Sequence, residues 1–553
     1  MTTDREGAAE APRQDEKLVI VASSLGTMFE WYDFYLYGLL ATYISAQFFS
    51  GVNETTAFIL ALAAFAAGFA VRPFGSLVFG RVGDLVGRKN TFLVTMVLMG
   101  LSTFAVGLLP SYAAIGVAAP LILVGLRLLQ GLAVGGEYGG AATYVAEHAP
   151  ADRRGFYTSF VQTTATAGLF MALLLVIGLR LALGETAFAD WGWRVPFLVS
   201  IALLAVSLWI RLKLNESPVF QRMKEQGTTS KAPLREAFGE WKNLKFVLIA
   251  LLGAVAGQAV LGYTGQFYTL FYLERIAKVD GATANIMIAI ALAMVTPFFV
   301  LFGWLSDRIG RKPLVVTGCL IAVIGYFPLF AALTQAANPA LAVAVETAPV
   351  TVIAHDAECS FQFDPIGRNT FDATSCDIAK AYLAKGGTNY ANVEAPAGHI
   401  AEVRVGGATI VAPDPRRVVG AARTAAIADF RAEVGAALAA AGYPERADAA
   451  AMNKPLVVAI LFAILLPVTM VYGPMAALLV ELFPARIRYS ALSLPYHVGN
   501  GWFGGFLPTT AFAMVAATGD IYYGLWYPVT IAAMTLVVGL LFLPETYRRN
   551  IDG

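Results

Sequence analysis

The chain has 553 residues, of which 58% are hydrophobic and only 14% charged, and its formal net charge is +1. Charged residues make up about 25% of an average soluble protein, whereas the apolar residues here gather in runs of about 20, the length that crosses a hydrocarbon core of about 30 Å. This composition excludes a soluble globular protein, and the near-zero net charge favours no nucleic-acid partner. We expect an all-α protein that crosses the membrane many times.

The apolar runs divide into two sets of six predicted spans. The first set lies at about 18–44, 57–79, 91–109, 118–138, 160–181 and 195–212. The second set lies at about 245–272, 284–303, 314–333, 456–472, 493–516 and 523–543. Residues 1–17 form a polar tail without the pattern of a cleaved signal peptide, residues 213–243 link the two sets, and residues 544–553 form a second tail.

Two sequence patterns occur twice. Residues 80–89 and 303–312 share G-x-x-x-D-x-x-G-R-K in short polar gaps between apolar runs, at an offset of about 223 residues. The pattern E-x-x-P-x-x-x-R begins at Glu147 and again at Glu481, at an offset of about 334 residues. The chain is therefore a duplication, and the different offsets predict an insertion of about 111 residues in the second copy.

The duplication predicts two six-helix halves. The first half is 18–212. The second half is divided into 244–335, which holds spans seven to nine, and 455–543, which holds spans ten to twelve. The insertion occupies 336–454 between these two parts.

Basic residues in the short loops predict the orientation. Those of both repeated motifs, together with Arg153, Arg486 and Arg548, fall on one side of the predicted membrane, whereas the opposite short loops 50–56 and 110–116 hold none. By the positive-inside rule, both termini are cytoplasmic and the insertion lies outside the cytoplasm. The expected location is a bacterial inner (plasma) membrane, with the insertion periplasmic or extracellular.

The insertion has the pattern of a small folded α/β unit. Short runs at 401–405 and 408–411 flank Gly406 and Gly407, which predicts a β-hairpin. Residues 420–441 carry a helical pattern.

The cysteines of the insertion are Cys359 and Cys376. An oxidising compartment would allow them to form a disulfide. His355, Asp356 and Glu358 are close in sequence, but the pattern is too weak to indicate a metal site, and none is expected.

The paired motifs and the segment Arg127-Leu-Leu-Gln-Gly131 resemble the major facilitator superfamily over nearly the whole chain outside the insertion. Residues 30–34 (Glu-Trp-Tyr-Asp-Phe) and 135–140 (Gly-Gly-Glu-Tyr-Gly-Gly) are similar to its metabolite:proton symporter branch, whose members carry small organic acids, shikimate, proline or betaines. The resemblance implies two halves that alternate access to a site between them. The long insertion is similar to that of permeases for short-chain monocarboxylates.

Ionisable residues inside the spans are few, and each costs roughly 2.5–3.5 kcal/mol at a helix centre, so they are candidates for function. Glu30 and Asp33 share one face of the first span. Two carboxylates in a poorly hydrated cavity do not both ionise readily, so we expect Asp33, with Glu30, to bind the coupled proton. The alternative is that they pair with Arg72 or Arg127 to make assembly of the bundle tolerable. Glu137 is also ionisable, but the pattern assigns it no role.

Arg127 in the fourth span, and then Arg72 in the second, are the expected ligands of an anionic substrate because a guanidinium presents a planar fork to a carboxylate. His497 is a further candidate for proton coupling, with a packing role as the alternative. Other polar side chains in the spans are candidates for substrate contact, or for hydrogen bonds between helices: Gln162, Gln258 and Tyr263.

The repeated motifs place carboxylates and arginines at the cytoplasmic ends of predicted spans. A carboxylate there can accept from the N-terminal amides of a helix, and a guanidinium can pair with a neighbour. We expect a gate that breaks when the halves rock; the alternative is a cluster that only fixes the topology. The expected gate residues are Asp84, Arg88, Asp307, Arg311, Glu147, Arg154, Glu481 and Arg488.

These features predict a secondary active transporter, a proton-coupled symporter that takes up a small carboxylate, with acetate, propionate or a haloacetate as the first choice. The alternatives are a symporter for a dicarboxylate, shikimate or proline/betaine and, from another class, a transporter-like sensor that uses the insertion. No Walker motif is present, so the proton gradient is the expected energy source and no cofactor is expected. No nucleophile and base pattern points to an enzyme. The expected partners are a small organic anion, a proton and membrane lipid, with the protein as a monomer.

Overall fold

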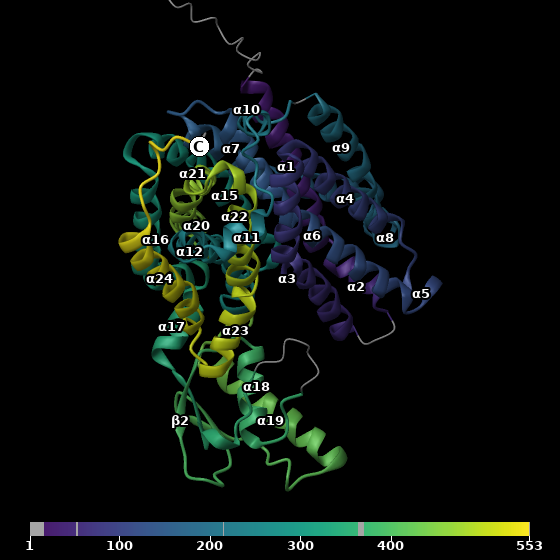
Figure 1. The fold of residues 1–553 in the computed structure, drawn as a ribbon. Helices are drawn as coiled ribbons and strands as arrows, with labels where there is room; N and C mark the ends of the chain where they lie inside the picture. Colours follow the sequence, from purple (N-terminus) through teal and green to yellow (C-terminus); the bar gives the residue numbers. More distant parts are fainter. Residues whose placement is uncertain (1–15, 51–53, 214, 363–369, 552–553) are drawn as a thin grey trace, which may run out of the picture.

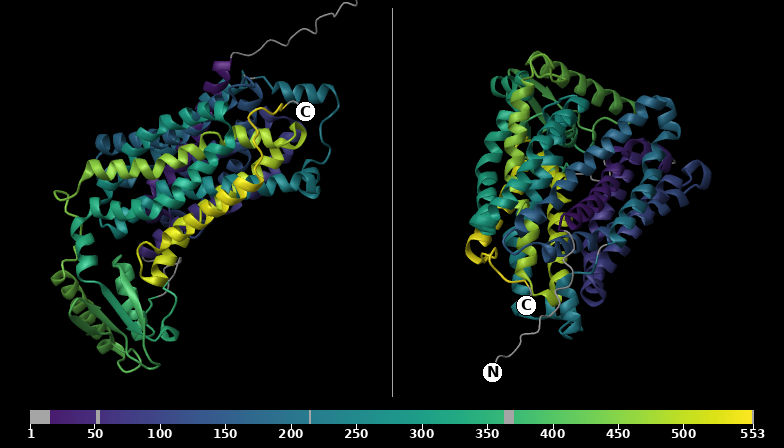
Figure 2. Two further views of the ribbon diagram at one scale, coloured as in Figure 1. Left: turned by 90° about the vertical axis from the view of Figure 1, so that its left-hand side faces the viewer. Right: turned by 90° about the horizontal axis from the view of Figure 1, so that it is seen from above.

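The computed structural model describes residues 16–50, 54–213, 215–362 and 370–551, with residues 16–23, 30, 54–63, 65 and 66 described by their backbone alone. Two helical halves stand side by side, and a small sheet lies at one end of the second half (Figure 1). The helix α10 and the C-terminus lie at the opposite end, which we call the tail end; the other is the sheet end (Figures 1 and 2).

The helices of the first half and of the linker follow each other in chain order. The first half contains α1 (Glu16–Leu39), α2 (Ala41–Phe48), α3 (Glu54–Val86), α4 (Arg88–Leu108), α5 (Tyr112–Ile115), α6 (Ala118–His148), α7 (Arg154–Leu183), α8 (Glu185–Asp190) and α9 (Val195–Leu212). The linker contains α10 (Pro218–Glu225) and α11 (Pro233–Gly239).

The second half is interrupted by the inserted sheet. Before it come α12 (Trp241–Ala250), α13 (Ala256–Tyr263), α14 (Thr269–Phe271), α15 (Gly281–Ile309), α16 (Arg311–Ala337) and α17 (Pro339–Thr347). After it come α20 (Lys454–Tyr472), α21 (Met475–Leu482), α22 (Arg488–Val498), α23 (Leu507–Thr518) and α24 (Trp526–Phe542). Wider π-helical segments interrupt two of its spans: η2 (Leu251–Val255), η3 (Thr264–Tyr268), η4 (Tyr272–Ile276) and η7 (Gly499–Gly504).

Nine helical stretches within the described residues are long and apolar enough to cross a membrane. They are Arg88–Leu108, Ala118–His148, Arg154–Leu183, Gly192–Leu212, Trp241–Ile276, Gly281–Ile309, Arg311–Ala337, Lys454–Leu482 and Tyr523–Phe542. The predicted first and second spans correspond to α1 and α3, and the predicted eleventh corresponds to α22, η7 and α23. Twelve crossings therefore stay a prediction.

The repeated motifs do not form the polar loops that the sequence suggested. Residues 80–86 are the last turns of α3 and residues 303–309 the last turns of α15, so each gap shrinks to a single residue, Gly87 or Gly310. Both glycines have positive φ angles, 128° and 102°, which residues with a side chain rarely adopt. The motif carboxylates and arginines therefore lie on helices on either side of a sharp corner.

Close helix packing places the polar residues of the first half. The helix α6 packs on α3, and a Cβ at Gly135 would lie 2.3 Å from the carbonyl oxygen of Arg72. The glycines of α6 therefore let the backbone of α3 approach closely. Contacts between the halves run from α3 to α22 and from α7 to α15.

The inserted segment contains a four-stranded sheet in the order β2-β1-β3-β4. Its strands are β1 (Val350–Ala354), β2 (Tyr390–Glu394), β3 (Glu402–Val405) and β4 (Ala408–Val411); β1 and β2 are parallel, and the other pairs are antiparallel. The predicted hairpin and helix are both present, as β3 with β4 and as α19 (Gly420–Ala440). A separate apolar core, including Val352, Leu383 and Phe430, holds the sheet to its helices.

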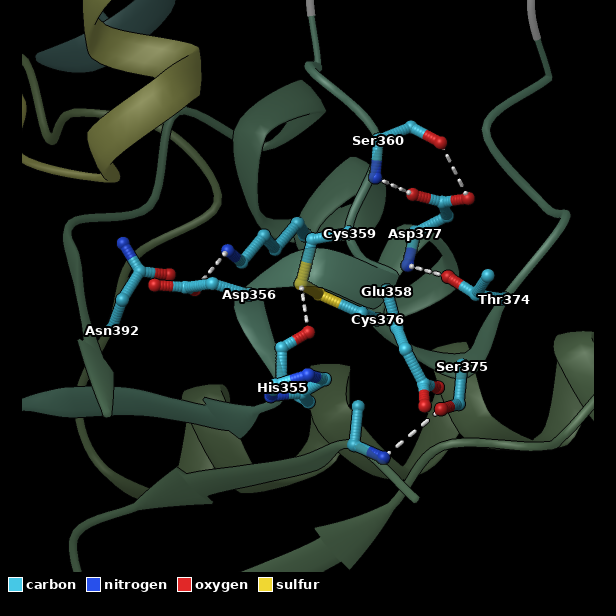
Figure 3. Close-up of a disulfide and its surroundings, with 12 residues drawn as sticks. His355, Asp356, Glu358, Cys359, Ser360, Thr374, Ser375, Cys376, Asp377 and Asn392 are labelled. Carbon is cyan, nitrogen blue, oxygen red and sulfur yellow. Dashed lines mark hydrogen bonds and ion pairs between the residues drawn. A yellow bond between two sulfur atoms is a disulfide. The ribbon is translucent and has the colours of Figure 1, made fainter. Parts of the chain in front are cut away.

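A disulfide joins Cys359 to Cys376, the second residue of α18 (Ser375–Lys385) (Figure 3). Around it, Asp377 accepts hydrogen bonds from the backbone N–H of Ser360 at 2.7 Å and from its hydroxyl at 3.0 Å. The Thr374 hydroxyl accepts from the Asp377 N–H and caps α18. These contacts fix the first turn of α18 beside the segment that follows β1.

Candidate functional site: a cavity between the two halves

A cavity lies between the two halves. Its volume, counted as the space that the centre of a water molecule can reach, is about 100 Å³. Helices α1, α3, α4, α6 and α7 line it from the first half, and α13, η3, α15, α20, α22 and η7 from the second. Its charged, imidazole and amide side chains are Arg72, Glu137, His497, Gln162, Gln258, Gln266 and Asn500. We call it the central cavity.

Arg72 is the one arginine among the described residues that line the central cavity, and no lysine is among them. Its side chain is buried, and its guanidinium carbon lies 4.1 Å from the ring centre of Phe69 and 5.0 Å from that of Phe34. It also interacts with Tyr263 from the second half. A cation held by aromatic faces at the junction of the halves can receive a carboxylate from the cavity.

Among the described residues that line the central cavity, Glu137 of α6 and His497 of α22 are the other ionisable groups that are not phenols. Both are buried, at 3% and 1% exposure. The Oε1 atom of Glu137 and both ring nitrogens of His497 have no hydrogen-bond partner among the described residues. Groups of this kind cost free energy unless a ligand, water or proton satisfies them, so both are available to a substrate or a proton.

Aromatic rings form most of the remaining wall: Trp31, Phe34, Tyr35, Tyr138, Tyr263, Phe267, Phe299, Tyr472 and Tyr496. Tyr138 of the first half stacks on Tyr496 of the second, with ring centres 3.4 Å apart. The Tyr472 and Tyr496 hydroxyls are 2.5 Å apart. These rings join the halves across the cavity, and they leave a small space with an apolar wall.

The three polar residues predicted as substrate contacts, Gln162, Gln258 and Tyr263, all line the central cavity. The amide of Gln162 donates to the Tyr138 hydroxyl at 3.0 Å, and the amide of Asn500 donates to Gln258 at 3.1 Å. Both glutamines therefore make the hydrogen bonds between helices that were the alternative interpretation, while their side chains still face the cavity.

Arg127 and Asp33 lie beside the central cavity rather than among its described lining residues. Arg127 donates to Gln130 at 2.7 Å and stacks on Tyr37 at 3.5 Å. It borders a smaller pocket that it shares with Arg72. Of the two arginines, Arg72 is among the described lining residues of the central cavity, whereas Arg127 makes its contacts within the first half; their roles as anion ligands stay a prediction.

Asp33 occupies another small pocket between α1, α4 and α9, with Met96, Gly100 and Ser200. It is buried and interacts electrostatically with Arg127. A buried carboxylate next to a buried guanidinium is an arrangement in which protonation and pairing compete. The side chain of Glu30 lies outside the part of the structure that is described.

Glu137 lines the central cavity, although its sequence pattern assigned it no role. The available signal was its place in Gly135-Gly-Glu-Tyr-Gly-Gly140, where small residues let two helices approach on both sides of the carboxylate. Without the position of α3 and α22, that signal does not say which way the side chain points.

The predicted gate residues meet at the tail end. Asp84 accepts hydrogen bonds from the backbone N–H groups of Tyr489 and Ser490, at 3.2 and 2.9 Å, at the start of α22 in the opposite half. Asp307 does the same for Gly155 and Phe156, at 2.8 Å each, at the start of α7. Each motif carboxylate therefore caps a helix of the other half, where the helix dipole favours negative charge.

Arginines and glutamates complete two similar networks. Arg88 donates to the Ala485 carbonyl at 2.6 Å, and Arg488 donates to Glu147 at 2.6 Å, both across the halves. In the second network, Arg311 pairs with Asp307 at 2.7 Å and with Glu481 at 3.0 Å, and Arg154 lies 3.8 Å from Glu481. All eight predicted gate residues lie in these contacts, which join the halves at the tail end.

Comparisons with known proteins agree with this architecture. The family model described as "Sugar (and other) transporter" matches residues 18–245 and 420–553, and the one described as "MFS/sugar transport protein" matches 141–364, so residues 365–419 lie outside both. An alpha-ketoglutarate permease of Escherichia coli is 36% identical over 320 residues, which is 58% of this chain and 72% of that protein. A proline/betaine transporter of Salmonella typhimurium is 36% identical over 56% of this chain, and the match spans 63% of its length.

A solved structure of the proton:xylose symporter XylE of the major facilitator superfamily, bound to 6-bromo-6-deoxy-D-glucose, has a TM-score of 0.60. It is 17% identical, and the match covers 97% of this chain and 98% of that one, so this likeness concerns the fold. The family matches, the permease relative and two helical halves around a central cavity lead to one conclusion: the chain belongs to the major facilitator superfamily and is a multi-pass membrane transporter.

Proposed function

We propose that this transporter is a proton-coupled symporter that takes up a small carboxylate, with a short-chain monocarboxylate such as acetate, propionate or a haloacetate as the substrate. The observation that carries the proposal is the position of Arg72, a buried cation that faces the central cavity between aromatic walls. A guanidinium suits a carboxylate better than an ammonium because its donors form a planar fork.

The charge of the central cavity supports one carboxylate on the substrate rather than two. When Glu137 is ionised it opposes Arg72 in the same cavity, so a dicarboxylate would meet one cation and one group of its own sign. A monocarboxylate needs only Arg72, and its short alkyl part fits against the aromatic walls.

A zwitterion such as proline or betaine is the second candidate. Glu137 and the rings of Trp31, Tyr35 and Tyr263 supply the acidic and aromatic partners that an ammonium needs. The similarity to proline/betaine transporters favours the same substrate class.

Asp33 with Arg127 is the proposed coupling pair, assisted by Glu30 and His497. Protonation of Asp33 would release Arg127 and change the balance of charge next to Arg72, with which Arg127 shares a pocket. Substrate and proton then favour the same state of the protein, which is the thermodynamic requirement for symport. The proton gradient would supply the energy without a cofactor.

In the proposed topology, twelve helical spans cross the membrane, the tail end and both termini lie in the cytoplasm, and the inserted unit lies outside. The transporter would work by alternating access. The basic residues of the motifs support this orientation, and the interlocked networks at the tail end support a gate between the halves. Opening toward the cytoplasm would then break the contacts of Asp84 and Asp307, and the function as a gate follows from their place between the halves.

The test is uptake of labelled acetate, chloroacetate, succinate, shikimate and betaine into proteoliposomes under an inward proton gradient. Protonophore and protein-free liposomes are the controls, because weak acids cross bilayers unaided. Accumulation of a monocarboxylate that the protonophore abolishes supports the proposal. Accumulation of betaine alone supports the second candidate, and the absence of any protein-dependent uptake contradicts symport.

A further inference from the structure

We propose that the sheet end carries an anion-collecting vestibule, a second binding region in which carboxylates gather before they reach the central cavity. The inference rests on the proposed uptake of a carboxylate and assigns a role to the inserted unit. The vestibule is a cavity between the inserted unit and the ends of η4 and α23. Its volume, counted in the same way as that of the central cavity, is about 920 Å³. Its size admits a hydrated anion without close contact.

Among the residues that the structure describes, three cations line the vestibule. They are Arg275 of η4, Lys385 at the last residue of α18 and Arg431 of α19, and all three side chains are exposed. No Asp or Glu is among the lining residues in the part of the chain that the structure describes. A cleft lined by one sign of charge, between walls of low dielectric constant, raises the local concentration of the opposite ion and its rate of association.

The vestibule lies on the helical path that leads to the central cavity. Gln266 and Phe267 of η3 line the central cavity, and Phe271 and Arg275 line the vestibule further along the same span. Nine residues separate Gln266 from Arg275, which corresponds to roughly 10–14 Å of helix. An anion near Arg275 is therefore separated by about two to three helical turns of one span from Gln266, a residue that lines the central cavity.

The junction between the inserted unit and the helices is closely packed, so the backbone that carries Lys385 is held beside the backbone that carries Arg275. The Tyr390 N–H donates to the Gly519 carbonyl at 3.0 Å, and the Asn392 amide donates to the Thr518 carbonyl at 2.6 Å. Gly387, at φ 61°, approaches Arg275 so closely that a Cβ would lie 2.3 Å from its carbonyl oxygen. These contacts dock β2 and the end of α18 onto η4 and α23.

The disulfide anchors the helix that carries Lys385. Cys376 is in the first turn of α18, and Lys385 ends it. Lys385 also lies within residues 365–419, outside both family matches, so the vestibule depends on a segment that the common fold does not supply.

The test compares uptake of a labelled monocarboxylate by the wild-type chain and by the triple variant Arg275→Gln/Lys385→Gln/Arg431→Gln in proteoliposomes. At low ionic strength of about 20 mM, we expect the KM of the variant to be about three- to tenfold higher with an unchanged maximal rate. At about 0.5 M salt the difference should fall to less than about twofold, since the Debye length drops to about 4 Å. An unchanged KM at low salt overturns the vestibule and leaves the proposed function intact.

A matched control, Arg404→Gln/Arg446→Gln/Lys454→Gln, removes the same number of charges from exposed residues outside the vestibule, and it should leave KM within about twofold of wild type. An equal rise of KM in this control overturns the proposal in favour of a general surface effect. The single variant Lys385→Glu, on an exposed position, provides a second measurement if the triple variant folds poorly; it should also raise KM, and an unchanged value overturns the proposal. If the wild-type chain shows no protein-dependent uptake of any carboxylate, the proposed function fails first and the vestibule with it.

Discussion

Glu147 of the first half and Arg488 of the second half are joined by a 2.6 Å ion pair whose two side chains are almost completely buried. The equivalent pair of the second network, Glu481 and Arg154, is separated by 3.8 Å. The duplicated networks are therefore unequal in this pair: the glutamate and arginine are in direct contact in one network and further apart in the other.

The first prediction follows from this inequality. Glu147→Gln leaves Arg488 buried without its counter-charge, and breaking a buried pair in this way costs about 3–5 kcal/mol. We expect it to open the tail end more than Glu481→Gln does. Distances between spin labels at the exposed Arg153 and Arg308, measured by pulsed electron resonance, report the change. An equal or larger opening in Glu481→Gln would contradict the prediction.

The second prediction separates the two arginines of the first half. Arg72→Gln removes the cation that faces the central cavity, and we expect affinity for the carboxylate to fall about 30- to 100-fold, since a charged hydrogen bond contributes roughly 1.5–3 kcal/mol. Arg127→Gln should change affinity for the carboxylate by less than about fivefold, because Arg127 belongs to the proposed coupling pair with Asp33 and is not among the described lining residues of the central cavity. Substrate-dependent protection against thermal unfolding measures both. The control is Arg211→Gln, a buried arginine that stacks on Phe92 away from the cavity.

The third prediction concerns coupling. Asp33→Asn cannot take up or release a proton, so we expect loss of accumulation driven by the proton gradient while exchange of internal for external substrate continues. Counterflow and gradient-driven uptake, measured in the same proteoliposomes, distinguish the two processes. The exposed Asp190 supplies the control Asp190→Asn, which should behave as wild type. Unchanged concentrative uptake in Asp33→Asn would rule out this carboxylate as the coupling residue.

The fourth prediction uses Glu137 to choose between substrate classes. For a monocarboxylate, Glu137→Gln removes a like charge from the cavity and should leave KM unchanged or lower it up to about tenfold. For a zwitterion, the same change removes the partner of the ammonium, and KM should rise more than about tenfold. Uptake of acetate and betaine by the variant therefore gives opposite results for the two candidates. A rise in the KM of acetate would contradict the monocarboxylate proposal.

The fifth prediction concerns the disulfide of the inserted unit. Cys359 and Cys376 are separated by 17 residues in the chain, and a loop of this length contributes about 3 kcal/mol in the chain-entropy view. We expect Cys359→Ser/Cys376→Ser to speed hydrogen exchange in α18 while the membrane helices keep their protection. Cys319→Ser, at the buried free cysteine, is the control and should leave α18 unchanged. Equal exchange in α18 with and without the bridge would contradict a stabilising role.

Much of the fold follows from the sequence because hydrophobic length and repetition are strong signals. The halves, the position of the insertion, its hairpin and the residues that join the halves were all predicted from runs and repeats. The helical state of residues 80–86 was not predicted, because their polar composition resembles a loop. In the structure these turns end α3, and Asp84 and Arg88 are buried against the other half.

The residues of the candidate site could be predicted from the sequence, but the directions in which their side chains point could not. The sequence identified Arg72, Arg127 and Asp33 as costly residues inside spans. It could not say which of them face the central cavity, because that depends on the close approach of α6 to α3 at Gly135. The same approach brings Arg72 to the cavity, where Glu137 also lies, and the rotation of two packed helices has no signature in either helix alone.

The π-helical segments of the described chain all belong to the second half, in η2, η3, η4 and η7. A π turn holds one residue more than an α turn, and returning to α geometry turns the following side chains by about 100° without breaking the helix. Within the stretch from Trp241 to Ile276 the helix returns to α geometry after η2 and again after η3. The duplicated halves therefore differ in helix geometry: the described part of the first half holds no π-helical segment, whereas in the second half such segments present Gln266 and Asn500 to the central cavity.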